Sequence, residues 1–187
     1  MENATDIDIM LRVKSGDVDK LSLLFDRYKQ RLFSYFYRLT LNAHHSEDLV
    51  QNVFVRILQY RHRYSERGPF SCWLYRIAHN VFIDHVRKNN RYQPTEDFSD
   101  FDILDEREQD DQFIRNEQLQ LLEKAMHLLS PDKREILVLS KYQQMRYKEI
   151  VKILGLSEAN VKIKVFRALN DLKEIYVKLE DMSYEEK

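Results

Sequence analysis

Glycine and proline are scarce in this sequence, which favours a chain that is helical almost throughout. Only three glycines and three prolines occur among 187 residues. Gly16, Gly68 and Gly155 each stand at a break between stretches of helical periodicity, where a glycine tolerates the left-handed conformation that ends many helices. We therefore predict an all-α protein with helices at about 5–15, 17–41, 45–61, 70–90, 113–128, 131–142, 146–154 and 157–178.

Charged side chains divide the chain into three parts. Residues 1–92 carry 15 Lys and Arg against 10 Asp and Glu, residues 93–111 carry one against nine, and residues 112–187 carry 14 against 12. The middle part also lacks helical periodicity. We therefore predict two small helical domains, 1–92 and 112–187, joined by a flexible acidic linker at 93–111. A loosely packed surface loop within a single domain is the alternative.

The composition disfavours several classes of protein. No apolar run approaches the roughly 18 residues of a membrane span, and the N-terminus MENATDIDIM has no signal-peptide pattern, so we expect no membrane insertion. Cys72 is the only cysteine, which favours a cytoplasmic protein without intramolecular disulfides. The six histidines show no metal-ligand spacing, and no Walker, GxGxxG or GxSxG motif is present. We therefore expect no metal, no cofactor and no enzyme activity.

The stretch YKEIVKILGLSEANVKIKVFRALNDL, residues 147–172, predicts a helix-turn-helix. Two short helical patterns meet at Gly155, and Ser157 can cap the second helix. The second helix of such a pair commonly enters the major groove of DNA. Its apolar stripe consists of Val161, Val165, Ala168 and Leu172. Its opposite face carries Asn160, Ile163, Lys164 and Arg167. The Asn, Lys and Arg of this face can reach bases or phosphates, although a helical hairpin that never touches DNA is the alternative.

The stretch GPFSCWLYRIAHNVFIDHVRKNNR, residues 68–91, predicts a helix with two unlike sides. The side expected to face a core carries Leu74, Ile77, Ala78, Val81 and His85. The opposite side carries the only tryptophan among polar and charged residues, namely Trp73, Arg76, Asn80, Asp84, Arg87 and Arg91.

These side chains suit an unpaired nucleic-acid strand. The arginines match a phosphate backbone, and Trp73 with nearby Tyr64 and Phe70 offers rings on which bases can stack. Asn80 can read a base edge, and Asp84 can hold a neighbouring arginine in place. The alternative is a tryptophan that covers a domain edge beside solvated arginines.

The two halves together resemble the extracytoplasmic-function (ECF) group of the bacterial sigma-70 family. LSLLFDRYKQRLFSYFYRLT and SEDLVQNVFVRIL are similar to that group's core-polymerase-binding helices. PFSCWLYRIAHNVFIDHVRK is similar to its WLxxIAxNxxxDxxR segment, which handles the minus-ten promoter element. LLSPDKREILVLSKYQQMRYKEIVKILGLSEANVKIKVFRAL is similar to its minus-thirty-five-reading domain. The likeness covers nearly the whole chain, and the order of the motifs makes the joint match strong.

The resemblance implies a subunit that directs core RNA polymerase to promoters and promotes DNA opening. The loop from Tyr64 to Ser71 and Asn80 would capture a base flipped from the non-template strand. The helix at 157–169 would read the minus-thirty-five element as duplex DNA, and residues 93–111 would thread through the polymerase. An anti-sigma factor is a further implied partner. The residues that would dock on a coiled coil of the largest polymerase subunit are Asp48, Gln51 and Asn52.

Some positions depart from the usual pattern of this group. Asn52 replaces a common Glu, Ile163 and Lys164 stand where Ser-Arg is frequent, and a Thr common at the Asn160 position is absent. Because Lys cannot make the bidentate guanine contact of Arg, the promoter sequence cannot be copied from relatives. The alternative function is a helix-turn-helix repressor or activator that binds duplex DNA on its own.

Overall fold

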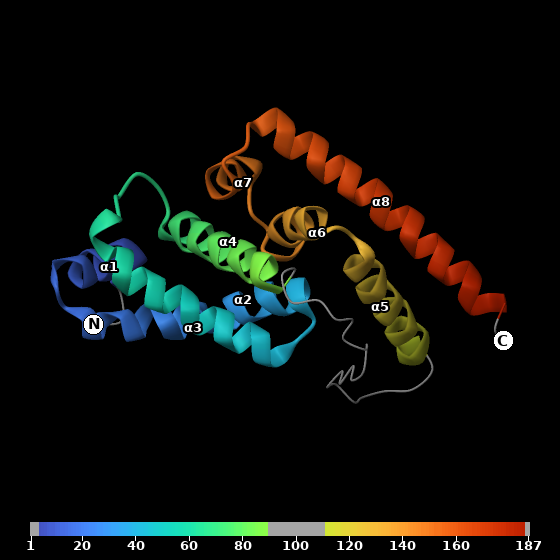
Figure 1. The fold of residues 1–187 in the computed structure, drawn as a ribbon, viewed down its shortest axis with the longest axis horizontal. Helices are drawn as coiled ribbons and strands as arrows, with labels where there is room; N and C mark the ends of the chain where they lie inside the picture. Colours follow the sequence, from blue (N-terminus) through green and yellow to red (C-terminus); the bar gives the residue numbers. More distant parts are fainter. Residues whose placement is uncertain (1–3, 90–110, 186–187) are drawn as a thin grey trace.

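The computed structural model describes residues 4–89 and 111–185, and all regular secondary structure in these ranges is helical (Figure 1). The first range contains α1 (Asp6–Ser15), the 3₁₀ turn η1 (Val18–Lys20), α2 (Leu21–Thr40), α3 (Ala43–Tyr60), the 3₁₀ turn η2 (Arg61–Arg63) and α4 (Phe70–Asn89). The second contains α5 (Asp111–Leu128), α6 (Pro131–Leu137), the π-helical turn η3 (Val138–Tyr142), α7 (Tyr147–Leu154) and α8 (Glu158–Glu185). The all-α prediction is confirmed. The predicted linker lies outside the described residues except for Asp111.

Helices α1 to α4 form the first helical unit. α2, α3 and α4 pack along one another, and α1 lies at one end of them (Figure 1). Local signals start two of these helices: Thr5 and Asp8 form a capping box, and Oδ1 of Asn42 accepts a hydrogen bond from the backbone of His45 at 2.8 Å. The apolar stripes of the helices meet in a core that includes Leu24, Leu32, Phe36, Val53, Ile57, Leu74, Ala78 and Val81.

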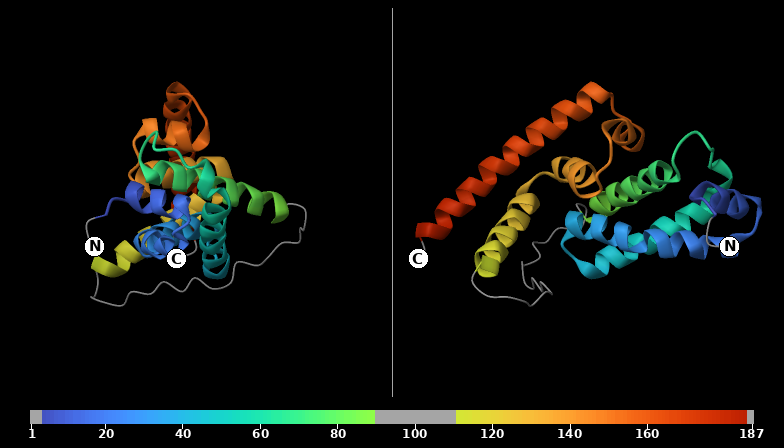
Figure 2. Two further views of the ribbon diagram at one scale, coloured as in Figure 1. Left: turned by 90° about the vertical axis from the view of Figure 1, so that its left-hand side faces the viewer. Right: turned by 180° about the vertical axis from the view of Figure 1, so that it is seen from behind.

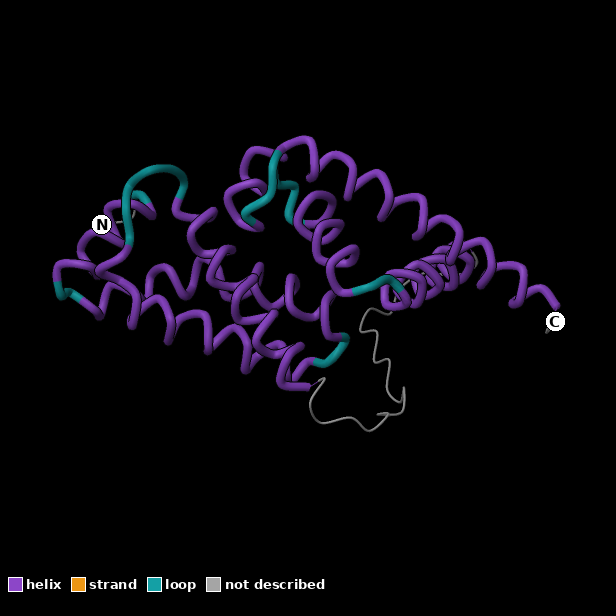
Figure 3. Tube along the Cα trace, turned by 45° about the horizontal axis from the view of Figure 1, so that its top comes forward, coloured by secondary structure: helices purple, strands orange, loops and turns teal. Residues whose placement is uncertain are grey.

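Helices α5 to α8 form the second helical unit. The long α8 packs against α5, α6 and α7, as the tube view also shows (Figure 3). Gly155 ends α7 with a φ of 68°, a left-handed conformation that glycine adopts without steric cost. The buried residues of this unit include Met126, Ile136, Leu137, Ile150, Ile153, Val161, Val165 and Ala168.

The two helical units also touch each other. α7 packs on α4, and η3 and α6 pack on α2. The right-hand view of Figure 2 shows α6 and α7 beside the first unit, whereas the far end of α8 points away from it. The sequence predicted two helical domains but gave no reason to expect contact between them.

Three of the helices differ from the prediction by more than a shift of one or two residues at an end. The helix expected from residue 17 starts with a 3₁₀ turn, and Asp17 makes no side-chain cap hydrogen bond there. The helix expected at 131–142 widens to π-helical geometry over its last five residues. α8 runs seven residues past the expected end, to Glu185.

Candidate nucleic-acid interface

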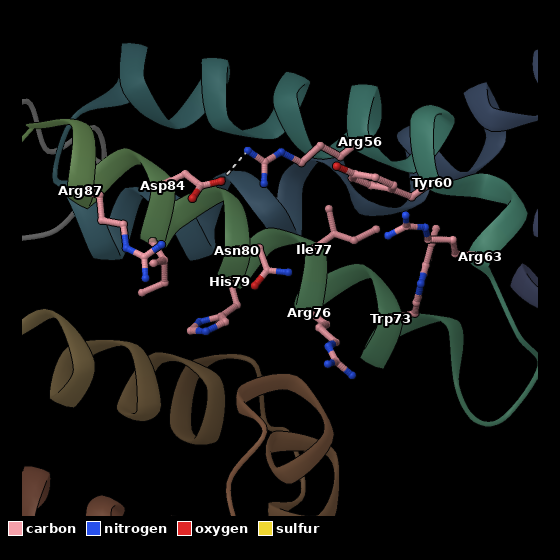
Figure 4. A pocket seen from close by; sticks show the side chains of 11 residues that line it. Arg56, Tyr60, Arg63, Trp73, Arg76, Ile77, His79, Asn80, Asp84 and Arg87 are labelled. Atoms are coloured by element: carbon pink, nitrogen blue, oxygen red, sulfur yellow. Dashed lines mark hydrogen bonds and ion pairs between the residues drawn. The ribbon is translucent and has the colours of Figure 1, made fainter.

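A groove of about 550 Å³ lies between α3 and α4 (Figure 4). It is lined by Arg56, Tyr60, Arg63, Trp73, Arg76, Ile77, His79, Asn80, Ile83, Asp84 and Arg87. Five of the six residues predicted for the outward side of α4 are among them, and the sixth, Arg91, lies outside the described residues. Four arginines against one aspartate make the groove electropositive, which suits a polyanionic ligand.

Trp73 stands at one end of the groove, supported from beneath by two aromatic rings. The ring centroid of Tyr64 lies 5.1 Å away in an edge-on arrangement, and that of Phe70 lies 6.1 Å away. Tyr64 and Phe70 are 1% and 2% exposed, whereas Trp73 is only partly buried. Of the three rings expected to face unpaired bases, only that of Trp73 therefore offers a surface; the other two hold it in place.

Asp84 pairs with an arginine across the groove. Its Oδ2 lies 2.7 Å from Nη2 of Arg56 on α3 (Figure 4). The sequence predicted that Asp84 holds an arginine, but the arginines considered were those of its own helix. The ion pair thus links the two walls of the groove instead of ordering one of them.

The wall formed by α3 and η2 was missed by the sequence analysis. Arg56, Tyr60 and Arg63 follow one another at spacings of four and three residues, and this helical spacing is the signal that would have placed them on one side. The guanidinium of Arg63 lies 5.2 Å from the ring centre of Tyr60, so the aromatic ring and the cation stand together in the groove.

Asn80 lies in the middle of the groove. It is exposed and stands one helical turn from both Arg76 and Asp84, so that its amide projects between the two walls (Figure 4). An amide at this place has arginines on either side, which can hold a phosphate backbone while the amide meets a base.

The helix-turn-helix forms as the sequence predicted. Oγ of Ser157 accepts a hydrogen bond from the backbone amide of Asn160 at 3.2 Å, which caps α8. Val161, Val165 and Ala168 are buried. The four residues expected to face DNA are all exposed on the other side of the helix, at Asn160, Ile163, Lys164 and Arg167.

Two features of this face were not predicted. Phe166 is 64% exposed and lies one turn from Ile163, so an aromatic ring borders the face. Phe166 lies between the apolar stripe and the polar face, so dividing the helix into these two sides did not identify it. Nζ of Lys164 lies 3.8 Å from Oδ2 of Asp132 on α6, both side chains being exposed, so this long ion pair does little to hold Lys164 away from a phosphate.

A separate polar surface lies on α3, roughly 100° around the helix from the groove. Asp48, Gln51 and Asn52 are all exposed there and share one side through their three- and four-residue spacing. Val55 continues this side and is 49% exposed. The sequence analysis missed it, because a valine in an amphipathic helix normally belongs to the core.

The described residues hold no arrangement typical of a metal centre. No three His, Cys, Asp or Glu side chains in these ranges are placed to ligate an ion. Burial, and then Glu149, raise the pKa of the Cys72 thiol, which favours its protonated form at neutral pH. No helix in the described ranges has the length and hydropathy to cross a membrane.

Comparison with known proteins identifies the two helical units. The model for Sigma-70 region 2 matches residues 24–92, and the model for Sigma-70, region 4 matches residues 119–172. The ECF RNA polymerase sigma factor SigM from Bacillus subtilis is 31% identical over 156 residues, which cover 82% of this chain and 93% of SigM.

Solved structures share the fold. CnrH in complex with the cytosolic domain of CnrY covers 89% of this chain and 94% of its own, with a TM-score of 0.67 and 22% identity. The sigma factor RpoE in complex with the anti-sigma factor NepR from Bartonella quintana covers 83% of this chain and 95% of its own, with a TM-score of 0.62 and 21% identity.

The chain therefore belongs to the ECF group of sigma-70-family factors and is an RNA polymerase sigma factor. Region 2 forms most of the first helical unit, and region 4, with its helix-turn-helix, lies in the second. Proteins of this family bind core RNA polymerase and promoter DNA and are not enzymes. The predictions of family, function and lack of enzyme activity are confirmed.

Proposed function

We propose that the groove between α3 and α4 binds the opened non-template strand of the minus-ten promoter element. The observation that carries this proposal is the joint lining of one groove by a supported tryptophan, an exposed asparagine and four arginines. Single-stranded DNA is bound by aromatic platforms set in an electropositive channel, and this groove offers both.

Each side chain of the groove has a distinct role in this proposal. Trp73 stacks on an unpaired base, and Asn80 reads a base edge. Arg76 and Arg87 neutralise phosphates. Asp84 positions Arg56, because an ion pair across the groove keeps the guanidinium pointed at the strand instead of at solvent.

The loop between η2 and α4 completes this site. Tyr64 and Phe70 act beneath Trp73 as its support, and the loop from Tyr64 to Ser71 accepts the flipped base through its exposed residues. A rigid support matters, because an aromatic ring that is already held in place loses little conformational freedom when a base stacks on it.

We propose that the first three turns of α8 read the minus-thirty-five element in the major groove of duplex DNA. Ser157 caps the helix, and its amino-terminal end carries positive dipole charge that favours a phosphate. Arg167 and Lys164 supply positive charge. Asn160 and Ile163 face the bases, where an apolar side chain can meet a thymine methyl group.

We propose that the side of α3 marked by Asp48, Gln51 and Asn52 docks on the largest subunit of core polymerase. Val55 belongs to the same surface, since an exposed apolar residue at the centre of polar ones is typical of a protein interface. Because this surface and the groove occupy different sides of α3, both partners can bind together.

The remaining proposals concern organisation and partners. The domains are residues 1–92 and 112–187, with 93–111 as an acidic linker, and the protein acts in the cytoplasm. An anti-sigma factor is a further proposed partner. It is supported by the RpoE structure, which was solved with an anti-sigma factor bound.

Run-off transcription tests the proposed function. Core polymerase is mixed with this chain and a library of promoter-containing templates, and we expect transcripts that appear only with both proteins present. Sequencing the DNA bound by this holoenzyme would then define the two promoter elements. If no template gave a transcript that depended on this chain, the proposal would be wrong.

A further inference from the structure

Helix α1 lies at the end of the first unit where the chain turns into the loop before α4 (Figure 1). The match to Sigma-70 region 2 begins only at residue 24, so α1 lies outside it. α1 contacts α2, η2 and α4, and its buried Met10 belongs to the core that also contains Tyr64 and Phe70. α1 therefore shares a core with the two rings that support Trp73.

The buried side of α1 carries a charged residue at each end. Asp6, Met10 and Lys14 follow one another at four-residue spacing, so they share one side of the helix. Met10, in the middle, is fully buried, whereas Asp6 and Lys14 are partly exposed. Each of these two charged side chains makes a hydrogen bond that leads to the aromatic cluster beneath Trp73.

Lys14 holds the start of the loop before α4. Its Nζ donates a hydrogen bond to the backbone carbonyl oxygen of Tyr64 at 2.7 Å, in a partly buried place. Tyr64 is the residue that directly follows η2, and its ring lies 5.1 Å from that of Trp73. A hydrogen bond from a charged donor is stronger than a neutral one. Lys14 therefore fixes the backbone from which the Tyr64 ring extends.

Asp6 holds the second supporting ring through a tyrosine of α2. Its Oδ2 accepts a hydrogen bond from the hydroxyl of Tyr28 at 2.5 Å, and its Oδ1 lies 2.6 Å from Nη1 of Arg27. The Tyr28 ring stands edge-on to that of Phe70, with 5.5 Å between the centroids. The Phe70 ring in turn lies 6.1 Å from Trp73. Two separate chains of contacts thus run from α1 to the tryptophan.

We propose that α1 is a positioning element of the groove, in which Lys14 and Asp6 hold the two rings beneath Trp73 so that this ring can stack on an unpaired base. The inference rests on the proposed function of the groove. Neither Lys14 nor Asp6 lines the groove, so both act through Tyr64 and Phe70. A ring that is held in place loses little freedom when a base stacks on it. Loosening the support therefore weakens stacking although Trp73 itself is unchanged.

Fluorescence of the free protein tests the effect on Trp73 directly. Trp73 is the only tryptophan in the chain, so the intrinsic emission reports on this ring alone. We expect Lys14→Ala to raise the acrylamide quenching constant roughly twofold or more, because a loosened ring meets solvent more often. Lys14→Arg keeps a charged donor and should restore most of the protection. Arg12→Ala is the matched control, since it removes the same charge from an exposed position of α1.

The second chain of contacts has its own pair of variants. Tyr28→Phe keeps the ring against Phe70 but removes the hydrogen bond to Asp6, and we expect a smaller rise in quenching. Tyr35→Phe is the control, because it removes a tyrosine–carboxylate hydrogen bond of the same helix, to Glu135. Its quenching should match that of the wild type even where its stability is lower. The comparison therefore separates support of Trp73 from a general loss of stability.

DNA binding by the holoenzyme tests the consequence for function. Core polymerase carrying each variant is titrated with a labelled single-stranded oligonucleotide that contains the minus-ten sequence defined by the holoenzyme-bound DNA. We expect Lys14→Ala to bind it roughly fivefold more weakly or worse, as for a partial loss of base stacking. Lys14→Arg and Arg12→Ala should bind nearly as well as the wild type, and all variants should bind core polymerase equally.

The outcomes separate this inference from the proposed function. The inference is refuted if Lys14→Ala lowers the free energy of unfolding but leaves quenching unchanged, if Lys14→Arg restores nothing, or if Lys14→Ala binds the oligonucleotide as tightly as Arg12→Ala. Should Lys14→Ala not fold, Tyr28→Phe compared with Tyr35→Phe makes the same decision. If the wild type directs no transcription, the proposed function falls, and quenching in the free protein still decides whether α1 holds Trp73.

Discussion

At the scale of single residues, the position of a side chain in the groove depends on the neighbouring side chains that it contacts. Trp73 keeps one side free because Tyr64 and Phe70 fill the space on the other. Asp84 acts through Arg56, with which it forms an ion pair across the groove. Roles that look alike in the sequence, such as three neighbouring aromatic rings, therefore divide into one contact and two supports.

Substitutions in the groove and on α3 should affect different steps. We expect Trp73→Ala and Asn80→Ala to lower open-complex formation by roughly tenfold or more, since the loss of one base–aromatic stack costs about 1–3 kcal/mol, and to leave core binding intact. Asp48→Ala should instead weaken core binding. Permanganate footprinting measures opening, and fluorescence anisotropy with labelled core measures binding. A reversed pattern would contradict the assignment of the two surfaces.

The hydroxyl of Tyr64 gives a test of its supporting role. It is buried and has no hydrogen-bond partner among the described residues, so Tyr64→Phe should leave the free energy of unfolding unchanged or raise it by up to about 1 kcal/mol. Tyr35→Phe is the matched comparison and should lower it by about 1–2 kcal/mol, because Glu135 then loses a partner. Urea denaturation measures both, and equal losses would contradict this account.

At the scale of elements, the turn between α5 and α6 is held together by a buried charged side chain, that of Arg134. Burying a charge is costly unless its hydrogen bonds are satisfied. The guanidinium of Arg134 bonds to the carbonyl oxygens of Met126, His127 and Leu129 in this turn. Burial, and then Arg134, lower the pKa of His127 to about 4. The imidazole is thus kept neutral beside a cation, and protonating it would oppose the packing of the turn.

Stability should accordingly fall in mild acid. The pKa of His127 is about 4 in the fold against 6.5 as its usual value, so the unfolded chain binds more protons between these limits. The free energy of unfolding is then highest above pH 6.5 and declines towards pH 4, with a slope below about 1.4 kcal/mol per pH unit because the side chain is partly solvated. His127→Gln should flatten this decline in urea titrations at several pH values; an unchanged slope would rule out His127 as the cause.

At the scale of the whole molecule, the two surfaces proposed to read DNA lie on units that contact each other directly. The groove belongs to the first unit and the outward face of α8 to the second, while α7 and α6 fill the space between. In the proposed function, each surface reads only a short promoter element. Specific binding therefore needs both surfaces to engage one promoter, and this requires a partner that fixes their separation.

The free protein should for this reason bind promoter duplex weakly. In a gel-shift assay at moderate salt, we expect a specific complex only when core polymerase is added, because the net charge of the chain is −1 and gives little general affinity for DNA. A scrambled duplex serves as the control. Tight, sequence-specific binding by the chain alone would instead indicate a repressor or activator.

The sequence by itself determined where the helices form and which residues share the buried or the exposed face of each helix. Gly155, Ser157 and the apolar stripe of α8 act within one or two turns, so periodicity and capping predict the helix-turn-helix without knowledge of the rest of the fold. The same holds for the outward side of α4 with Trp73 and Asn80. These features are local, because they follow from which side chains share a helical face.

Only the tertiary structure decided which distant residues those helical faces contact. Nothing in the sequence marks Arg134 and Glu135 as buried, yet both are, and hydrogen-bonding groups of α2 and α4 reach them. The sequence did not identify Arg56 as the partner of Asp84. It also indicated two sides of α4, whereas a third side contacts the second helical unit. Such pairings join residues far apart in the chain, and periodicity along one helix carries no information about which distant helix will lie beside it.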